Sequence, residues 1–330
     1  MRVKHPVRET RPVTSAPRLQ PLVRARVAGL GDVGAAWVEA LPGRLGELAA
    51  AWDLELGRGL PGGSASYVVR GRTGGGDERV VKVALPGQEA ALAREAAVLA
   101  AADGRGYVRL LAHDGGADGS PALLLESLGP SLDAALLPPE QVLDVVADLL
   151  RTAWRVPVPA GTADAGDAAV TPGPRSRAVV LAALVREADA RHPGVCDPAV
   201  RDHALTLARD LAATDDPGRW VPCHGDPHPA NVLRRGEGWA LVDPDGVRAD
   251  PAYDLGVLVR EWTHRVRRSE DPRALVAGWC ARLGERTGTD PARIEAWGFL
   301  ERVSTGLHVV DFGATAMGRT FLDSAVRLLP

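Results

Sequence analysis

Apolar residues recur with helical spacing early in the chain and form short strand-like runs soon afterwards. Trp37, Leu41, Leu45 and Leu48 are three or four positions apart, which predicts an amphipathic helix between residues 35 and 52, with Pro42-Gly43 as a candidate break. The β-branched and apolar runs that follow predict four strands, with a helix between the second and the third. These strands cover residues 65–70, 78–85, 108–112 and 122–126, and the helix covers 88–102.

Beyond residue 130 the pattern is mainly helical. It predicts helices at 141–154, 178–190, 199–213, 253–266, 272–286 and 291–310, with a short β-like island at 220–247. Strands early and helices late indicate an α+β protein made of two lobes of different class. Residues 1–25 mix Arg, Pro, Thr and Ser without periodicity, so we expect them to form a disordered arm.

The overall charge narrows the classes of function. The chain has 39 Lys and Arg against 42 Asp and Glu in 330 residues, a net charge of −3, which excludes the strong positive field of a general nucleic-acid binder. No apolar run reaches the ~18 residues that suggest a membrane span, and the amino terminus lacks the apolar core of a signal peptide. We therefore expect a cytoplasmic protein without nucleic-acid or membrane partners. The 3 cysteines lack metal-ligand spacing and indicate neither a disulfide framework nor a zinc site.

Two residue types are unusually scarce. The chain has a single Asn, Asn231, and only two Lys, Lys4 and Lys82. A GC-rich coding sequence would produce this depletion, and chance is a sufficient explanation for Lys4 in its Pro- and Arg-rich surroundings. Asn231 and Lys82, by contrast, both fall inside segments that are candidates for chemistry.

The β-like island contains the densest set of candidate catalytic residues. Asp226 is followed five residues later by Asn231, and Asp243 ends the apolar run that begins at Trp239. Phosphoryl transfer needs a carboxylate that orients the attacking hydroxyl and accepts its proton, and oxygen ligands for the Mg²⁺ that bridges the phosphates. These three residues provide that set. A metal-dependent hydrolase is the alternative, because His224, Asp226 and His228 could together bind zinc or iron. That alternative leaves Asn231 and Asp243 without a role.

The segment His224-Gly225-Asp226 through Asn231, with Asp243, resembles the catalytic loop and metal-binding motif of the aminoglycoside phosphotransferases. The similarity runs from about residue 30 to the end and is greatest to the streptomycin 6-phosphotransferase and hydroxyurea phosphotransferase branch. The resemblance implies that Asp226 is the catalytic base, that Asn231 and Asp243 bind magnesium, and that His224 shapes the loop. Pro227 departs from the family, which usually has Leu or another ordinary residue there, and its fixed φ puts the loop geometry in question.

The resemblance also implies a nucleotide site in the early part of the chain. Lys82, in the second strand-like run, would contact the phosphates of the nucleotide, and Glu95 in the next helix would pair with Lys82. A turn that could face phosphate and a hinge segment that could hold adenine complete the expected set; the residues are Gly62, Gly63 and Ser64 in the turn and Glu126 and Leu128 in the hinge.

The resemblance implies a protein-kinase-like fold with a small antiparallel-sheet lobe, one main helix, and a mainly helical second lobe. The expected organisation is a nucleotide-binding lobe at 26–126, a hinge at 127–133 and a helical lobe at 134–330. It further implies a monomer that uses ATP, or GTP, with Mg²⁺ to phosphorylate a cationic, hydroxylated small molecule. Residues 251–330 hold 11 Arg against 10 Asp and Glu, so they show no acidic excess for such a substrate. A kinase of hydroxyurea or another metabolite, or a catalytically silent nucleotide-binding protein, stays open as an alternative.

Overall fold

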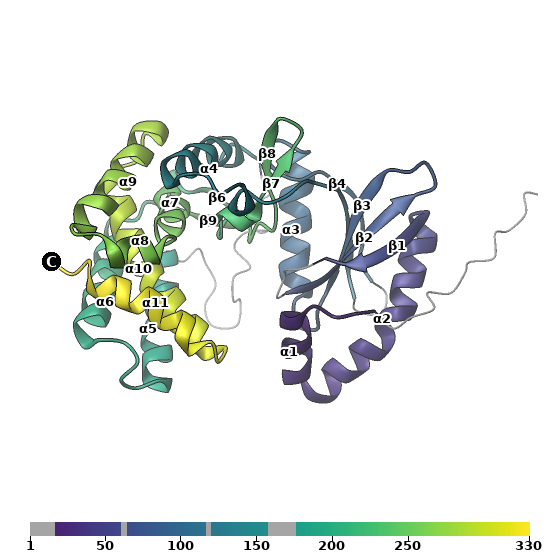
Figure 1. The fold of residues 1–330 in the computed structure, drawn as a ribbon, viewed down its shortest axis with the longest axis horizontal. Coiled ribbons are helices and arrows are strands. Elements are labelled where there is room, and N and C mark those ends of the chain that lie inside the picture. The colour runs from purple at the N-terminus through teal and green to yellow at the C-terminus, as the bar shows by residue number, and fades with distance from the viewer. Residues whose placement is uncertain (1–16, 61–64, 117–119, 158–175) are drawn as a thin grey trace, which may run out of the picture. The chain divides into compact units, whose positions relative to one another are not determined.

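The computed structural model describes residues 17–60, 65–116, 120–157 and 176–330 (Figure 1). The predicted phosphate turn, Gly62 to Ser64, lies outside these ranges. The chain divides into two compact units. The first comprises the residues up to Ala96 together with Arg109–Ser127, and the second comprises Ala97–Val108 and Leu128–Pro330.

The first unit is built around a five-stranded antiparallel sheet with strand order β1-β2-β3-β5-β4. Its elements are helices α1 (Pro21–Gly29) and α2 (Gly31–Ala51) and strands β1 (Leu54–Gly59), β2 (Ser66–Thr73), β3 (Glu78–Ala84), β4 (Leu110–Asp114) and β5 (Ala122–Glu126). Helix α3 (Glu89–Ala102) follows β3 and begins in this unit, whereas its residues from Ala97 onward belong to the second unit. The sequence pattern predicts neither β1 nor α1. Helix α1 corrects the expected arm only at its end, because Pro21 begins a helix and Val23 is fully buried. Residues 1–16 of that arm lie outside the described ranges.

The apolar stripe of α2 packs on one face of this sheet (Figure 1). Leu41 and Leu48 on the helix belong to the same buried cluster as Val81 and Val83 on β3. Because side chains alternate between the two faces of a strand, Lys82 lies on the opposite face from these two valines. Helix α2 continues through Pro42 without ending there.

The second unit is mainly helical. Its helices are α4 (Pro139–Ala153), α5 (Arg177–Arg191), α6 (Pro198–Ala213), α7 (Pro251–Val259), α8 (Thr263–Arg268), α9 (Pro272–Thr287), α10 (Pro291–Asp311) and α11 (Thr315–Val326), with short 3₁₀ turns η1 (Asp133–Ala135), η2 (Pro217–Arg219) and η3 (Pro229–Asn231). The β-like island forms two small antiparallel pairs of strands. Strand β6 (Val221–Cys223) pairs with β9 (Val247–Ala249), and β7 (Val232–Arg235) pairs with β8 (Gly238–Leu241).

Several helices of this unit begin with the same local signal, an Asp followed by Pro. The carboxylates of Asp197, Asp250, Asp271 and Asp290 accept hydrogen bonds from backbone N–H groups in the first turns of α6, α7, α9 and α10. Such a cap stabilises a helix by about 1 kcal/mol, and Pro suits the first helical position because its missing N–H would have no partner there.

Helix α7 is the most deeply placed of these helices, and every residue from Ala252 to Val259 is buried. It crosses α10 at Gly256, where a Cβ atom would lie only 2.5 Å from the Cβ of Trp297. The single helix predicted over 253–266 is wrong. The chain leaves the helical path at Trp262, whose φ is +51°, and α8 begins at Thr263. Arg260 and Glu261 are therefore placed at the end of a buried helix.

No helix in the described part of the chain is long and apolar enough to cross a membrane.

Candidate active site

The segment from His224 to Asp226 follows β6 and is held by Asp254, from the first turn of α7. The Asp254 carboxylate accepts hydrogen bonds from the N–H groups of His224 and Gly225, both at 2.9 Å, and from the indole N–H of Trp154, also at 2.9 Å. Tyr253 donates its hydroxyl to the carbonyl of Gly225 at 3.0 Å. Burial raises the pKa of the fully enclosed Asp254 to about 6, against the opposing effect of these hydrogen bonds. Helix α7 thus fixes the backbone of the loop.

His224 is fully buried and uses both ring nitrogens within the protein. Its Nε2 lies 2.8 Å from the carbonyl oxygen of Val242, and its Nδ1 accepts the N–H of Asp226 at 3.2 Å. Nε2 therefore carries the proton. Burial lowers the pKa of His224 to about 4, so the ring is neutral at neutral pH. With both ring nitrogens occupied, His224 has no nitrogen left to bind a metal, so the alternative of a metal-dependent hydrolase loses one of its three ligands.

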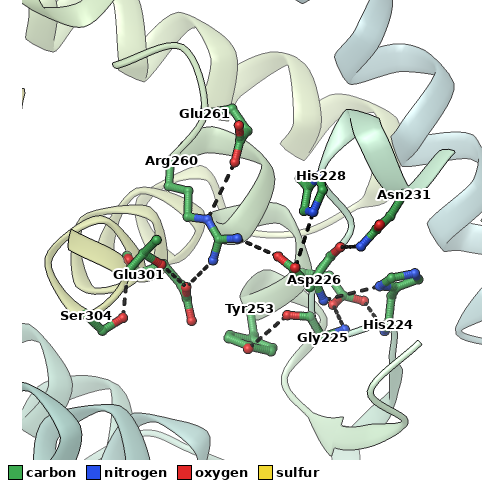
Figure 2. Close-up of polar contacts among 12 residues, drawn as sticks. His224, Gly225, Asp226, His228, Asn231, Tyr253, Arg260, Glu261, Glu301 and Ser304 are labelled. Atoms are coloured by element: carbon green, nitrogen blue, oxygen red, sulfur yellow. Dashed lines mark hydrogen bonds and ion pairs between the residues drawn. The ribbon is translucent and has the colours of Figure 1, made fainter. Parts of the chain in front are cut away.

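Asp226 presents its carboxylate at the surface of this unit, and 38% of the side chain is exposed. Arg260 donates a hydrogen bond to Oδ1 at 2.5 Å, and Nε2 of His228 lies 3.4 Å from Oδ2 (Figure 2). Burial alone would raise the pKa of Asp226, but the hydrogen bond from His228 and the charge of Arg260 outweigh it and hold this pKa well below its usual range. Asp226 is therefore ionised at neutral pH and can accept a hydrogen bond from a hydroxyl group.

Pro227 fits the loop instead of distorting it. The N–H of His228 donates to the carbonyl of Asp226 at 2.9 Å, which closes a three-residue turn with Pro227 at its centre. Such a turn needs a central φ close to the value that the proline ring imposes, and it uses no N–H from its central residue. The departure from the family pattern at Pro227 is therefore compatible with an ordered loop.

The β7–β8 hairpin brings the two predicted metal ligands to the same end. Val232 pairs with Leu241, and the N–H of Val242 donates to the carbonyl of Asn231 at 2.9 Å, so Asn231 lies across from the residue that precedes Asp243. The amide nitrogen of Asn231 donates to the carbonyl of Asp226 at 3.0 Å, which directs the amide oxygen the other way. Asp243 has φ +60°, an uncommon backbone conformation for a residue other than Gly that often marks a functional site.

This donor set fits Mg²⁺. Mg²⁺ prefers oxygen ligands and is usually bound through one or two protein carboxylates, with substrate phosphates and water completing the shell. The amide oxygen of Asn231 and the carboxylate of Asp243 are of that kind. Residues 17–60, 65–116, 120–157 and 176–330 contain no group of three His, Cys, Asp or Glu side chains that could hold a metal without such help.

Lys82 and Glu95, in the first unit, form a buried ion pair. Nζ of Lys82 lies 2.6 Å from Oε2 of Glu95, and the two side chains are 7% and 6% exposed. Glu89, in the first turn of α3, accepts the N–H of Gly87. The predicted hinge residues lie at the division between the units. Glu126 accepts the N–H of Arg109 at 2.7 Å, and Leu128 is half-buried. The nucleotide-binding roles of these residues stay predictions.

Some residues of the site are not predicted by the sequence pattern. Arg260 contacts Asp226 from 34 positions away in the chain, and Glu301 contacts Arg260 from 41 positions away. Trp154 reaches Asp254 across 100 positions. The available signal for Arg260 is its position directly after the fully apolar turn Val257 to Val259, where a charged side chain that follows a buried helix needs a partner.

Residues 57–297 match the model of a family described as the phosphotransferase enzyme family. The chain is 30% identical over 302 residues to the streptomycin 6-kinase of Streptomyces glaucescens, with 90% of this chain and 92% of the relative covered. It is 32% identical over 302 residues to the hydroxyurea phosphotransferase of Kitasatospora aureofaciens, with 90% of this chain and 81% of the relative covered.

Among solved structures, the chain is similar to the aminoglycoside phosphotransferase of Streptomyces rimosus in complex with ADP and streptomycin. The TM-score is 0.52 and the identity 20%, with 80% of this chain and 98% of that chain covered. At this identity the similarity concerns the fold. It confirms the fold class predicted from the sequence.

Proposed function

This chain belongs to the phosphotransferase enzyme family, and on that premise we propose that it transfers the terminal phosphoryl group of ATP to a hydroxyl of a streptomycin-type aminoglycoside. The observation that carries the proposal is the ionised, partly exposed Asp226, held on a loop that brings Asn231 and the strand leading to Asp243 together. The 30% identity to a streptomycin 6-kinase over most of both chains supports the acceptor class.

Asp226 has the central role in the proposed transfer. Its carboxylate accepts a hydrogen bond from the acceptor hydroxyl and orients that oxygen for in-line attack on the phosphorus. As the new oxygen–phosphorus bond forms and the bond to ADP breaks, the hydroxyl proton passes to the carboxylate. The neutral ring of His224 keeps the Asp226 backbone in place through its Nδ1.

The remaining assigned residues hold the nucleotide. Asn231 and Asp243 are the side chains that would bind Mg²⁺, which when bound offsets the negative charge of the phosphates. In the first unit, Lys82 is assigned to the nucleotide phosphates, and Glu95 fixes its ammonium group. These assignments predict that ATP binding depends on Lys82, whereas turnover depends on Asp226.

Hydroxyurea is the second candidate acceptor, because a hydroxyurea phosphotransferase is 32% identical over 302 residues. The two candidates differ strongly in size and charge. A streptomycin-type acceptor carries several hydroxyls and positive charges, whereas hydroxyurea is small and neutral. An acceptor panel therefore separates them directly.

The experiment is a coupled ADP-release assay on the purified protein with Mg²⁺ and either ATP or GTP. The acceptors are streptomycin, other aminoglycosides and hydroxyurea, and the Asp226→Asn variant is the control. We expect acceptor-dependent ADP release with streptomycin that D226N lacks. ADP release with hydroxyurea alone would show that hydroxyurea, and not an aminoglycoside, is the acceptor. Nucleotide binding without ADP release for any acceptor would indicate a catalytically silent nucleotide-binding protein.

A further inference from the structure

Arg260 links the Asp226 carboxylate to two other acidic groups. Its Nη2 donates to Oδ1 of Asp226 at 2.5 Å, and its Nη1 donates to Oε2 of Glu301 at 2.6 Å. Its Nε lies 3.6 Å from Oε1 of Glu261. Figure 2 shows the guanidinium between Asp226 and Glu301, with Glu261 on its third side. A single planar guanidinium is therefore hydrogen-bonded to two carboxylates and lies beside a third.

The position of Arg260 is determined by the packing of α7 on α10. Close approach at Gly256 brings the end of α7 to the middle of α10, where Glu301 lies. The Glu301 side chain is only 3% exposed and also accepts the hydroxyl of Thr305 at 3.3 Å. Arg260 is itself 11% exposed, so both members of this pair have little freedom to reorient.

Asp226, by contrast, has a side chain that is open to solvent and needs external contacts to keep one orientation. Arg260 binds one carboxylate oxygen, and His228 lies beside the other. Each carboxylate oxygen has two acceptor sites, so these contacts leave room for a hydroxyl. They also set the plane of the carboxylate, and a reacting group displaced by about 1 Å can lose about a hundredfold in rate.

We propose that Arg260 is the positioning residue for the transfer: it fixes the Asp226 carboxylate in its productive orientation, and Glu301 fixes Arg260. This inference rests on the proposed function, because the orientation matters only if Asp226 acts on an acceptor hydroxyl. Arg260 acts through Asp226 and does not itself contact the reacting atoms. A purely structural ion pair at the same place would stabilise the fold without affecting the reaction of Asp226 in particular.

The test is a double-mutant cycle between Arg260 and Asp226, measured with saturating ATP and the acceptor that the wild-type enzyme phosphorylates. Arg260→Gln should lower kcat about tenfold to a hundredfold and leave the KM for ATP unchanged. In the Asp226→Asn background the same substitution should have no further effect, because its target is already lost. Equal fold-losses in both backgrounds, or an unchanged kcat for R260Q, would overturn the proposal.

Folding must be separated from positioning, because R260Q leaves the buried Glu301 carboxylate without its cation. Arg260→Lys keeps a positive charge for Glu301, but one ammonium group cannot reproduce the planar fork that joins two carboxylates. We therefore expect R260K to retain a wild-type melting temperature within a few degrees and still lose at least about tenfold in kcat. Wild-type turnover by R260K would overturn the proposal even if R260Q fails to fold.

Arg282→Gln is the matched control. Arg282 makes two hydrogen bonds of 2.7 Å to Asp144, between α9 and α4, and touches none of the residues assigned to the reaction. It should leave kcat unchanged. If the wild-type enzyme phosphorylates none of the panel, the proposed function fails and the inference fails with it. An active wild type with additive losses refutes the positioning role alone.

Discussion

Asp254→Asn gives the most informative test of how the loop is held, because it removes a charge and keeps the size of the side chain. Asp254 is fully buried and accepts three hydrogen bonds, two at Oδ2 and one at Oδ1. The single oxygen of an asparagine can still accept the two hydrogen bonds from His224 and Trp154, but the NH₂ group of the asparagine then faces the N–H of Gly225. One lost hydrogen bond and one unsatisfied donor should lower the free energy of unfolding by about 1–3 kcal/mol.

The way in which this loss in the free energy of unfolding depends on pH gives a more specific prediction. Burial raises the pKa of Asp254 from 3.8 to about 6 in the folded protein. The folded state thus retains a proton that the unfolded state has already released, so the contribution of Asp254 to stability is greatest below pH 4 and is lost as the pH rises through 6. The full loss is about 3 kcal/mol, of which about 1.4 kcal/mol falls between pH 5 and pH 7.5. Asparagine does not titrate.

The assay is urea unfolding of the wild type and D254N at pH 5 and pH 7.5. The deficit of D254N should be larger at pH 5 than at pH 7.5 by about 1.4 kcal/mol. Trp154→Phe is a control for which the stability deficit should change with pH in the opposite direction. Removing the indole N–H takes a hydrogen bond from the ionised carboxylate and raises the Asp254 pKa further, so the deficit of W154F should grow with pH. A D254N deficit that is constant or grows with pH would contradict a raised pKa of Asp254 in the folded protein.

Three further changes test other parts of the proposed site. Gly225→Ala should reduce turnover and lower the free energy of unfolding by about 1–3 kcal/mol, because Gly225 has φ +95° and a Cβ there would lie 2.6 Å from the Cβ of Asp245; steady-state kinetics and urea unfolding measure both, and a fully active, stable G225A would contradict the expectation. Lys82→Met should abolish tight ATP binding and lower the free energy of unfolding by about 3–5 kcal/mol, because it removes the cation that pairs with the buried Glu95 carboxylate; adding Glu95→Gln should restore stability, measured by thermal melting, without restoring ATP binding, measured by calorimetry. Removal of Mg²⁺ with EDTA should stop turnover and excess Mg²⁺ should restore it, so turnover that persists in EDTA would exclude the assigned metal role.

Local sequence signals are sufficient to predict the elements and candidate site residues that lie together in short segments of the chain. The spacing of Asp226 and Asn231 places both on one loop, and the strand before Asp243 pairs with the strand after Asn231. The alternation along β3 separates Lys82 from the apolar face of its strand, and the helical spacing of α3 then brings Glu95 to it. These positions depend on periodicity, which the sequence carries directly, whereas the roles predicted for the residues come from the family resemblance.

The elements that the sequence pattern does not predict lack such a periodic signal. Helix α1 has nine residues, of which only Val23 and Val27 are buried, so its apolar stripe is too short to recognise. Strand β1 contains Gly57 and Gly59, a residue type that strands usually avoid. Helix α11 packs through Gly318 against Gly306, a contact that depends on the absence of a side chain.

The linkage of Arg260 to Glu301 and Asp226 could not be predicted because it depends on long-range packing. The pattern over 253–266 reads as one helix, and nothing local indicates that Trp262 adopts a positive φ. That break leaves Arg260 at the end of α7 and near the middle of α10, where it meets Glu301. Sequence spacing predicts which carboxylate is catalytic, whereas the tertiary fold determines which side chains contact it.

Mass spectrometry of the acceptor shows whether Asp226 acts in phosphoryl transfer to a small-molecule hydroxyl. Streptomycin incubated with ATP, Mg²⁺ and the wild-type enzyme should gain one phosphoryl group. The same reaction with Asp226→Asn should be slower by about a hundredfold to ten-thousandfold, the usual contribution of a general base. Equal phosphorylation by the wild type and D226N would contradict the role of Asp226, and no phosphorylated product from any acceptor would contradict the proposed function.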